Sequence, residues 1–165
     1  IDTSGAYPGI EAEEKGQSEA IAKNLAEMFG IKVPIVAVVI GEGGSGGALG
    51  IGVADSILML ENSVYSVISP EGCATILFND SKKAPDAARS LKIDSISLKS
   101  FGIIDGIVKE PLGGAHRDLK QASINLKTAV LKEFKKIDKF EIENLLEKRY
   151  NKYRKIGEFF EKEGE

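Results

Sequence analysis

The feature that most constrains the fold is a run with five glycines in seven residues, GEGGSGG at 41–47. It follows the apolar, β-branched segment 33–40, which is typical of a buried strand in a sheet covered on both faces. Glycine lets a backbone turn sharply and approach a ligand or another backbone closely. We therefore predict a strand-to-helix turn whose N–H groups hold an oxygen that gains negative charge.

The segments around this run alternate between strand and helix patterns, which favours an α/β fold. Before the run we predict one helix over 11–29, because Ile21, Leu25 and Met28 recur at helical spacing. After it we expect strands over 57–60, 65–68 and 103–108, and helices over 45–54, from Ser69, over 85–91 and over 95–101. Two charged helices follow residue 119, the second with an apolar stripe from Ile142 to Phe160. We predict an α/β core over 1–118 and peripheral C-terminal helices over 119–165.

Composition excludes several classes of protein. The single cysteine, Cys73, forbids an internal disulfide, and the single histidine, His116, leaves too few ligands for a zinc site in this chain. A formal charge of −3 gives no attraction to nucleic acid or anionic lipid, and no apolar run approaches the length of a membrane span. We predict a soluble cytoplasmic protein without a metal of its own. Because the chain opens without an initiator Met, we also expect a fragment of a longer protein.

The glycine run matches a dinucleotide fingerprint. Gly41, Gly43 and Gly46 have the required spacing, and Glu61 lies where a ribose-binding carboxylate is expected. Against this interpretation, the following helix is short and a complete helix precedes the first strand. An NAD-binding oxidoreductase of Rossmann type remains one alternative.

The same run matches the nucleophile elbow of serine hydrolases. Ser45 stands between Gly43 and Gly47, and Asp105 and His116 follow in the order of an α/β-hydrolase triad. This pattern arises easily in any segment so rich in glycine, and nothing near His116 in sequence would orient its ring. A serine hydrolase is the second alternative.

A third interpretation assigns the chemistry to the backbone alone. The N–H groups of Gly46, Gly47 and Ala48 would then open a helix and form part of an oxyanion hole. Tight packing of a helix on a sheet explains one or two glycines but not five. The glycine run by itself leaves all these interpretations open.

Five motifs occur together and in order: DTSGAYPG at 2–9, GQSEAIA at 16–22, GEGGSGGAL at 41–49, YSVISPEGC at 65–73 and PLGGAHR at 111–117. Over roughly residues 1–131 they resemble the carboxyltransferase alpha-subunit family of bacterial acetyl-CoA carboxylase. Ser4 stands where that family usually has proline. The resemblance implies a crotonase/ClpP-like fold of stacked β-β-α units. It also implies a biotin-dependent carboxyltransferase of fatty acid biosynthesis, which transfers a carboxyl group from carboxybiotin to acetyl-CoA to form malonyl-CoA.

The resemblance also implies the site. The Gly5–Ala6 and Gly46–Gly47 peptides match the family's N–H donors to the ureido oxygen of biotin. Around the cofactor we further expect Tyr7, Gly43, Gly44, Ser45 and Ala48.

The implied partners are a beta subunit in an α2β2 assembly, the biotin carboxyl carrier protein and biotin carboxylase. In this family the beta subunit holds acetyl-CoA and bears the only zinc. We therefore expect this chain to be inactive by itself.

Overall fold

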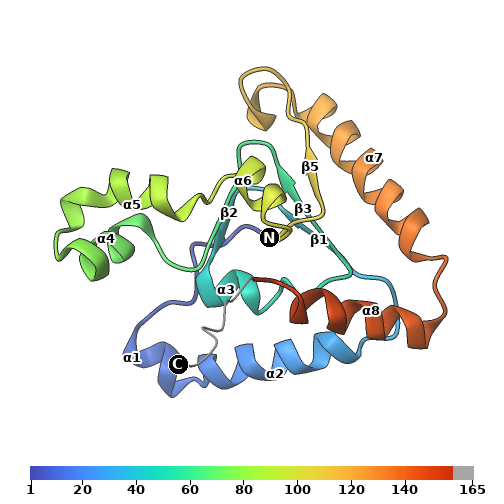
Figure 1. The fold of residues 1–165 in the computed structure, drawn as a ribbon, viewed down its shortest axis with the longest axis horizontal. Coiled ribbons are helices and arrows are strands. Elements are labelled where there is room, and N and C mark those ends of the chain that lie inside the picture. Colours follow the sequence, from blue (N-terminus) through green and yellow to red (C-terminus); the bar gives the residue numbers. More distant parts are fainter. Residues whose placement is uncertain (158–165) are drawn as a thin grey trace, which may run out of the picture.

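The structure is a computed structural model that describes residues 1–157. Its strands form two parallel sheets (Figure 1). Strands β1 (Val36–Val39), β3 (Ser56–Leu60) and β5 (Gly106–Val108) form one sheet in the order β1-β3-β5, and β2 (Glu42–Gly44) pairs with β4 (Val64–Ser66) in the other. Two successive units, β1-β2 and β3-β4, each place the first strand in the larger sheet and the second in the smaller one, before a helix. The expected stacked β-β-α arrangement is confirmed.

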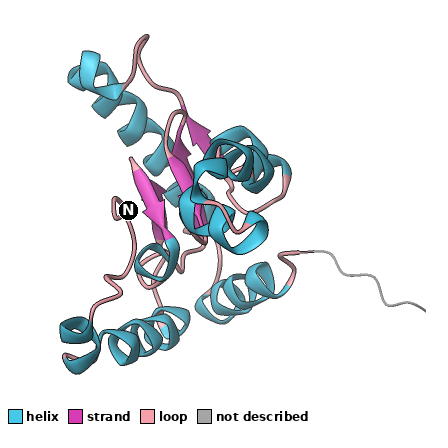
Figure 2. Ribbon diagram, turned by 90° about the vertical axis from the view of Figure 1, so that its left-hand side faces the viewer, coloured by secondary structure: helices cyan, strands magenta, loops and turns pink. Residues whose placement is uncertain are grey.

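Helices surround these sheets, as Figure 2 shows. Helix α3 (Ser45–Leu49) follows β2, and α4 (Pro70–Phe78) follows β4. Helix α4 and α5 (Ala84–Leu91) form an arm that projects from the sheets (Figure 1). The remaining helices are α1 (Ile10–Glu14), α2 (Gln17–Gly30), α6 (Ser95–Ser100), α7 (Leu119–Ile137) and α8 (Ile142–Arg154), with short 3-10 turns η1 (Ser81–Lys83) and η2 (Ala115–Arg117). In the described part of the chain, no helix combines the length and apolarity that crossing a membrane requires.

The core lies on both faces of the three-stranded sheet, because successive side chains of a strand point to opposite faces. On one face, Leu58, Leu60 and Val108 pack against Ala129 and Val130 of α7. The opposite face carries the larger cluster, whose buried members are Ala37, Val39, Ala54, Ile57, Met59, Leu98 and Ile104.

The predicted single helix over 11–29 is wrong, because the structure has two helices there. Gly16 has φ +77°, a left-handed conformation that costs glycine nothing, and its N–H donates to the carbonyl of Glu13 at 2.9 Å. The chain therefore turns at Gly16 and starts again as α2. The helix expected over 45–54 is also too long, since α3 ends at Leu49. Beyond the end of α3 the backbone passes close to the helix, because a Cβ on Gly52 would lie 2.8 Å from the carbonyl oxygen of Ala48.

We predicted a plain strand-to-helix turn over the glycine run. The structure instead places a strand, β2, within it. Thr3 N donates to Glu42 O at 2.6 Å, Gly44 N donates to Thr3 O at 2.8 Å, and Val64 N donates to Gly41 O at 3.0 Å. These bonds place β2 between residues 1–4 on one side and β4 on the other. Helix α3 begins only after this strand.

Helix α8 is tied to the rest of the molecule through a buried arginine. Arg149 is 1% exposed, and its guanidinium donates to both carboxylate oxygens of Asp55 at 2.9 and 2.8 Å. It also donates to the carbonyls of Met28, Ile31 and Val33 at 3.0, 2.7 and 2.9 Å, at and beyond the C-terminal end of α2. The division at residue 118 stays a prediction, but Arg149 anchors α8 in the core. Phe160 of the expected stripe lies outside the described residues.

Candidate functional site

The candidate site begins where the loop 3–6 lies directly on the glycine run. Gly5 has φ +128°, a conformation that side-chain-bearing residues rarely adopt. A Cβ on Gly44 would lie 2.2 Å from the carbonyl oxygen of Ser4, and one on Gly47 would lie 2.7 Å from the carbonyl carbon of Gly5. Only glycine at 44 and 47 permits this contact between two backbones.

The N–H groups at this contact differ in whether they already have a hydrogen-bond acceptor. Gly5 N donates to Thr3 Oγ1 at 3.2 Å, so it is engaged. Within residues 1–157, no loop or side-chain acceptor receives the N–H of Ala6 or Gly47, and Gly47 stands in the first turn of α3, where N–H groups lack an intrahelical partner. Ala48 is fully buried at the fourth helical position, where the N–H bonds within the helix. The geometry therefore favours Ala6 and Gly47 as donors.

A pocket of about 460 Å³, here called the loop pocket, opens at these two donors. Gly5, Ala6 and Gly47 form one wall of it. Helix α2 forms the other through Gln17, Ala20, Ile21 and Asn24, and Gly50 and Ile51 complete the lining. None of these residues is charged.

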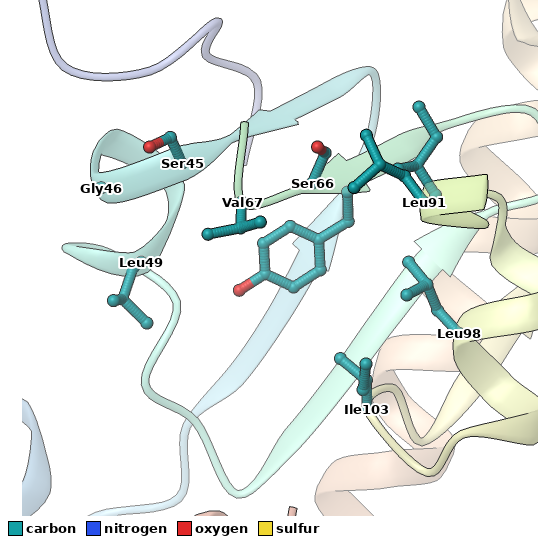
Figure 3. A pocket seen from close by; sticks show the side chains of 10 residues that line it. Ser45, Gly46, Leu49, Ser66, Val67, Leu91, Leu98 and Ile103 are labelled. Carbon is teal, nitrogen blue, oxygen red and sulfur yellow. The ribbon is translucent and has the colours of Figure 1, made fainter. Parts of the chain in front are cut away.

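A second pocket of about 330 Å³, here called the apolar pocket, borders α3 at Ser45 and Gly46. Figure 3 shows Leu49, Val67 and Ile103 around it. Tyr65 also lines it, and burial raises the pKa of the Tyr65 phenol above its usual value.

The structure brings some of the predicted site residues together and leaves others apart. Gly5, Ala6 and Gly47 meet at the loop pocket, whereas Ser45 and Gly46 line the apolar pocket. Neither pocket is lined by Gly43 and Gly44 in β2, by Ala48, or by Tyr7, whose side chain is largely exposed. The roles of all these residues stay predictions.

Sequence reasoning missed two side chains at the loop pocket. Gln17 bonds to the backbone of Tyr7, and Asn24 donates to the carbonyl of Gly50. Both belong to helix α2, and Gln17 lies inside a motif that carried the family resemblance. The signal was a polar side chain directly after Gly16, where a helix begins.

The structure supports neither of the two alternatives, the NAD-binding oxidoreductase and the serine hydrolase. Glu61, the ribose-binding candidate, is paired with Lys109 at 2.6 Å, and this hydrogen bond is the main cause that lowers the pKa of the Glu61 carboxyl. Asp105 accepts from Ile57 N at 2.7 Å and pairs with Lys152.

No hydrogen bond in the described range joins Ser45, Asp105 and His116 to one another, so they form no triad. Among residues 1–157, no cluster of three or more His, Cys, Asp or Glu side chains could hold a metal ion.

Stacked β-β-α units, with two glycine-lined loops meeting at a pocket, define a protein of crotonase-like fold. The fold is similar to that of transcarboxylase 12S, solved with hydrolysed methylmalonyl-coenzyme A bound, at a TM-score of 0.59 and 23% identity over 78% of this chain and 25% of that one. It is also similar to a Pseudomonas malonate decarboxylase hetero-tetramer in complex with coenzyme A, at a TM-score of 0.65 and 16% identity over 93% of this chain and 62% of that one. At these identities the likeness shows the fold alone.

The sequence identifies the family. The chain belongs to the acetyl co-enzyme A carboxylase carboxyltransferase-like family, whose model matches residues 1–157. It is 60% identical to the acetyl-coenzyme A carboxylase carboxyl transferase subunit alpha of Fusobacterium nucleatum, over 96% of this chain and 51% of the relative. The corresponding subunit of Bacillus cytotoxicus is 59% identical over 96% and 49%. The resemblance drawn from the five motifs is confirmed, and the chain spans about half the length of these curated relatives.

Proposed function

We propose that this chain is the carboxybiotin-binding half of a carboxyltransferase that transfers a carboxyl group to acetyl-CoA and forms malonyl-CoA. The observation that carries the proposal is the meeting of Ala6 and Gly47 at the loop pocket. Two backbone donors, one in the loop 3–6 and one in the first turn of α3, border a pocket whose lining is uncharged, and no loop or side-chain acceptor among the described residues receives either N–H.

The pocket fits biotin in its chemistry. The ureido ring of biotin is uncharged and carries one carbonyl oxygen, which suits a lining of glycine, alanine and amide side chains. When bound, biotin supplies the carboxyl group, and its ureido oxygen gains negative charge as that group departs. Ala6 and Gly47 would bind this oxygen through their N–H groups, and a single donor of this kind contributes about 3 kcal/mol to transition-state stabilisation.

Hydrogen bonding, rather than proton transfer, is the role that these residues can perform. No Asp, Glu, His or Lys within residues 1–157 lines the loop pocket, so the lining offers no general base. The apolar pocket supplies only the hydroxyl groups of Ser45, Ser66 and Tyr65.

The reaction also requires partners, which belong to the same proposal. A beta subunit would hold acetyl-CoA and the zinc ion, in an α2β2 assembly in the cytoplasm, and the biotin carboxyl carrier protein would bring biotin loaded by biotin carboxylase. The relatives are named as alpha subunits, which supports an assembly of more than one kind of chain.

Reconstitution tests the proposal. The full-length protein, combined with its beta subunit, is expected to decarboxylate malonyl-CoA only when biotin is added, and neither subunit is active by itself. Gly47→Val should abolish this turnover, because the added side chain would meet the Gly5 backbone. Turnover without biotin, or normal turnover in Gly47→Val, would contradict the proposal.

A further inference from the structure

Gln17, the first residue of α2, makes two hydrogen bonds to a single backbone residue. Tyr7 N donates to Gln17 Oε1 at 3.1 Å, and Gln17 Nε2 donates to Tyr7 O at 2.9 Å. The side-chain amide thus satisfies both the donor and the acceptor of Tyr7, as a residue on a neighbouring antiparallel strand would. Neither peptide group of Tyr7 can rotate without losing one of these bonds.

The two hydrogen bonds from Gln17 fix one end of the segment that bears the candidate donor, the N–H of Ala6. The N–H of Ala6 belongs to the Gly5–Ala6 peptide, and the next peptide along the chain ends at Tyr7 N. On the other side, Thr3 Oγ1 holds Gly5 N at 3.2 Å. Glycine has the widest backbone freedom of any residue, so without both anchors the Gly5–Ala6 peptide could turn its N–H away from the loop pocket.

Helix α2, which carries Gln17, is itself attached to other parts of the molecule. Gln17 begins a helix of 14 residues, and Asn24 of that helix donates to the carbonyl of Gly50, directly after α3. At the other end of α2, Arg149 holds the carbonyl of Met28 at 3.0 Å. Helix α2 is therefore attached both to α3 and to the buried arginine, and Gln17 transmits its position to the loop.

We propose that Gln17 is a positioning residue, which acts through the Tyr7 backbone to aim the Ala6 N–H at the oxygen bound in the loop pocket. The inference rests on the proposed function and extends it to a side chain outside both donor loops. A donor held in place before the reaction needs no reorganisation as charge develops, so its loss affects the transition state more than the ground state.

The test compares Gln17→Met with Gln121→Met in the full-length protein assembled with its beta subunit. Both replacements remove an amide from the first turn of a helix at similar side-chain length, but Gln121 is exposed and, among residues 1–157, its side-chain amide bonds only to Asn125. Removing one oxyanion donor costs about 100- to 1000-fold in kcat, and a misaimed donor retains part of its effect. We therefore expect Gln17→Met to lower kcat for biotin-dependent decarboxylation by about 10- to 100-fold with little change in the KM for biotin.

A second measurement follows the loop directly. Hydrogen exchange of the peptide that contains Ala6 and Tyr7 should become faster in Gln17→Met and stay unchanged in Gln121→Met. Where Gln17→Met does not fold, Gln17→Glu replaces it, because Glu keeps an acceptor for Tyr7 N and lacks the donor to Tyr7 O, and the same fall in kcat is expected.

Equal kcat values in the two methionine variants, a change in KM alone, or unaltered exchange of the loop would overturn the inference. Failure of the wild-type assembly to use biotin would instead overturn the proposed function, so the two failures are distinguishable.

Discussion

Two neighbouring glycines in α3, Gly46 and Gly47, should respond differently to the same replacement by alanine: we expect activity to fall in Gly47→Ala and to be retained in Gly46→Ala. A Cβ on Gly47 would lie 2.7 Å from the carbonyl carbon of Gly5 and 3.0 Å from Ala6 N. A Cβ on Gly46 would meet only the Cδ1 atom of Ile21, at 3.9 Å. Both alanines keep their N–H groups, so the pair separates the close backbone approach from the donors themselves.

The expected effect follows from these distances. Packed carbon atoms lie about 3.5–4.0 Å apart, so the loop at Gly5 must retreat by about 0.8 Å or more in Gly47→Ala. A misplacement of about 1 Å in a catalytic constellation costs about 100-fold in rate. Gly46→Ala meets no such obstacle, and alanine raises helix stability by up to about 1 kcal/mol over glycine.

The assay is biotin-dependent decarboxylation of malonyl-CoA by the full-length protein with its beta subunit. We expect kcat/KM to fall about 100-fold in Gly47→Ala and to stay within about twofold of wild type in Gly46→Ala. Thermal melting of each assembly checks that both variants are folded. Wild-type turnover in Gly47→Ala, or an equal loss in both variants, would refute the argument that backbone contact at 47 sets the site.

Three further predictions concern the fold and the rejected chemistry. Arg149→Met leaves the Asp55 carboxylate buried without its partner and should lower the free energy of unfolding by about 3–5 kcal/mol in urea titrations, against less than about 0.5 kcal/mol for the exposed Arg154→Met. Burial raises the pKa of the Tyr153 phenol from its usual value of 10.0 to about 12, so its contribution to stability is complete below pH 10 and is lost as pH rises toward 12. Unfolding measured across that range should therefore lose part of its pH dependence in Tyr153→Phe, and an unchanged profile would contradict the assignment. A fluorophosphonate probe should leave Ser45 unlabelled in mass spectra, because no histidine in the described residues bonds to it.

Local patterns predicted alternating strands and helices and most of the helices, but not the strand inside the glycine run, and the stacked β-β-α units were implied only by the family resemblance. Strand β2 exists because Thr3 and Val64, distant in sequence, pair with it on either side. The residue types of Glu42–Gly44 do not predict a strand, since glycine weakens strands as well as helices. Such an element becomes visible only when its neighbours are known.

The roles of individual glycines were also beyond sequence reasoning. Gly46 and Gly47 are identical in type and adjacent, yet only Gly47 touches the neighbouring backbone closely. Likewise, Gly5 and Ala6 matched the family as a pair, but a hydroxyl of Thr3 engages the first and leaves the second free among the described residues. Tertiary contacts, rather than residue type, assign these roles.

The sequence of the charged C-terminal helices did not indicate that one of their residues, Arg149, is buried. In sequence, Arg149 stands among Lys and Glu residues, as on a solvated helical face. The carbonyls and the carboxylate that surround it come from the end of α2 and from Asp55. Only the folded chain distinguishes this arginine from its exposed neighbours.

The reach of Arg149 also sets an order of events during synthesis. Its guanidinium binds the carbonyl of Met28, 121 positions earlier in the chain. At about 5–20 residues per second, a ribosome needs about 6–24 s to cover that interval. Until α8 has emerged, the carbonyls at the end of the nascent α2 helix lack this partner, so the second attachment of the helix that walls the loop pocket forms only late in synthesis.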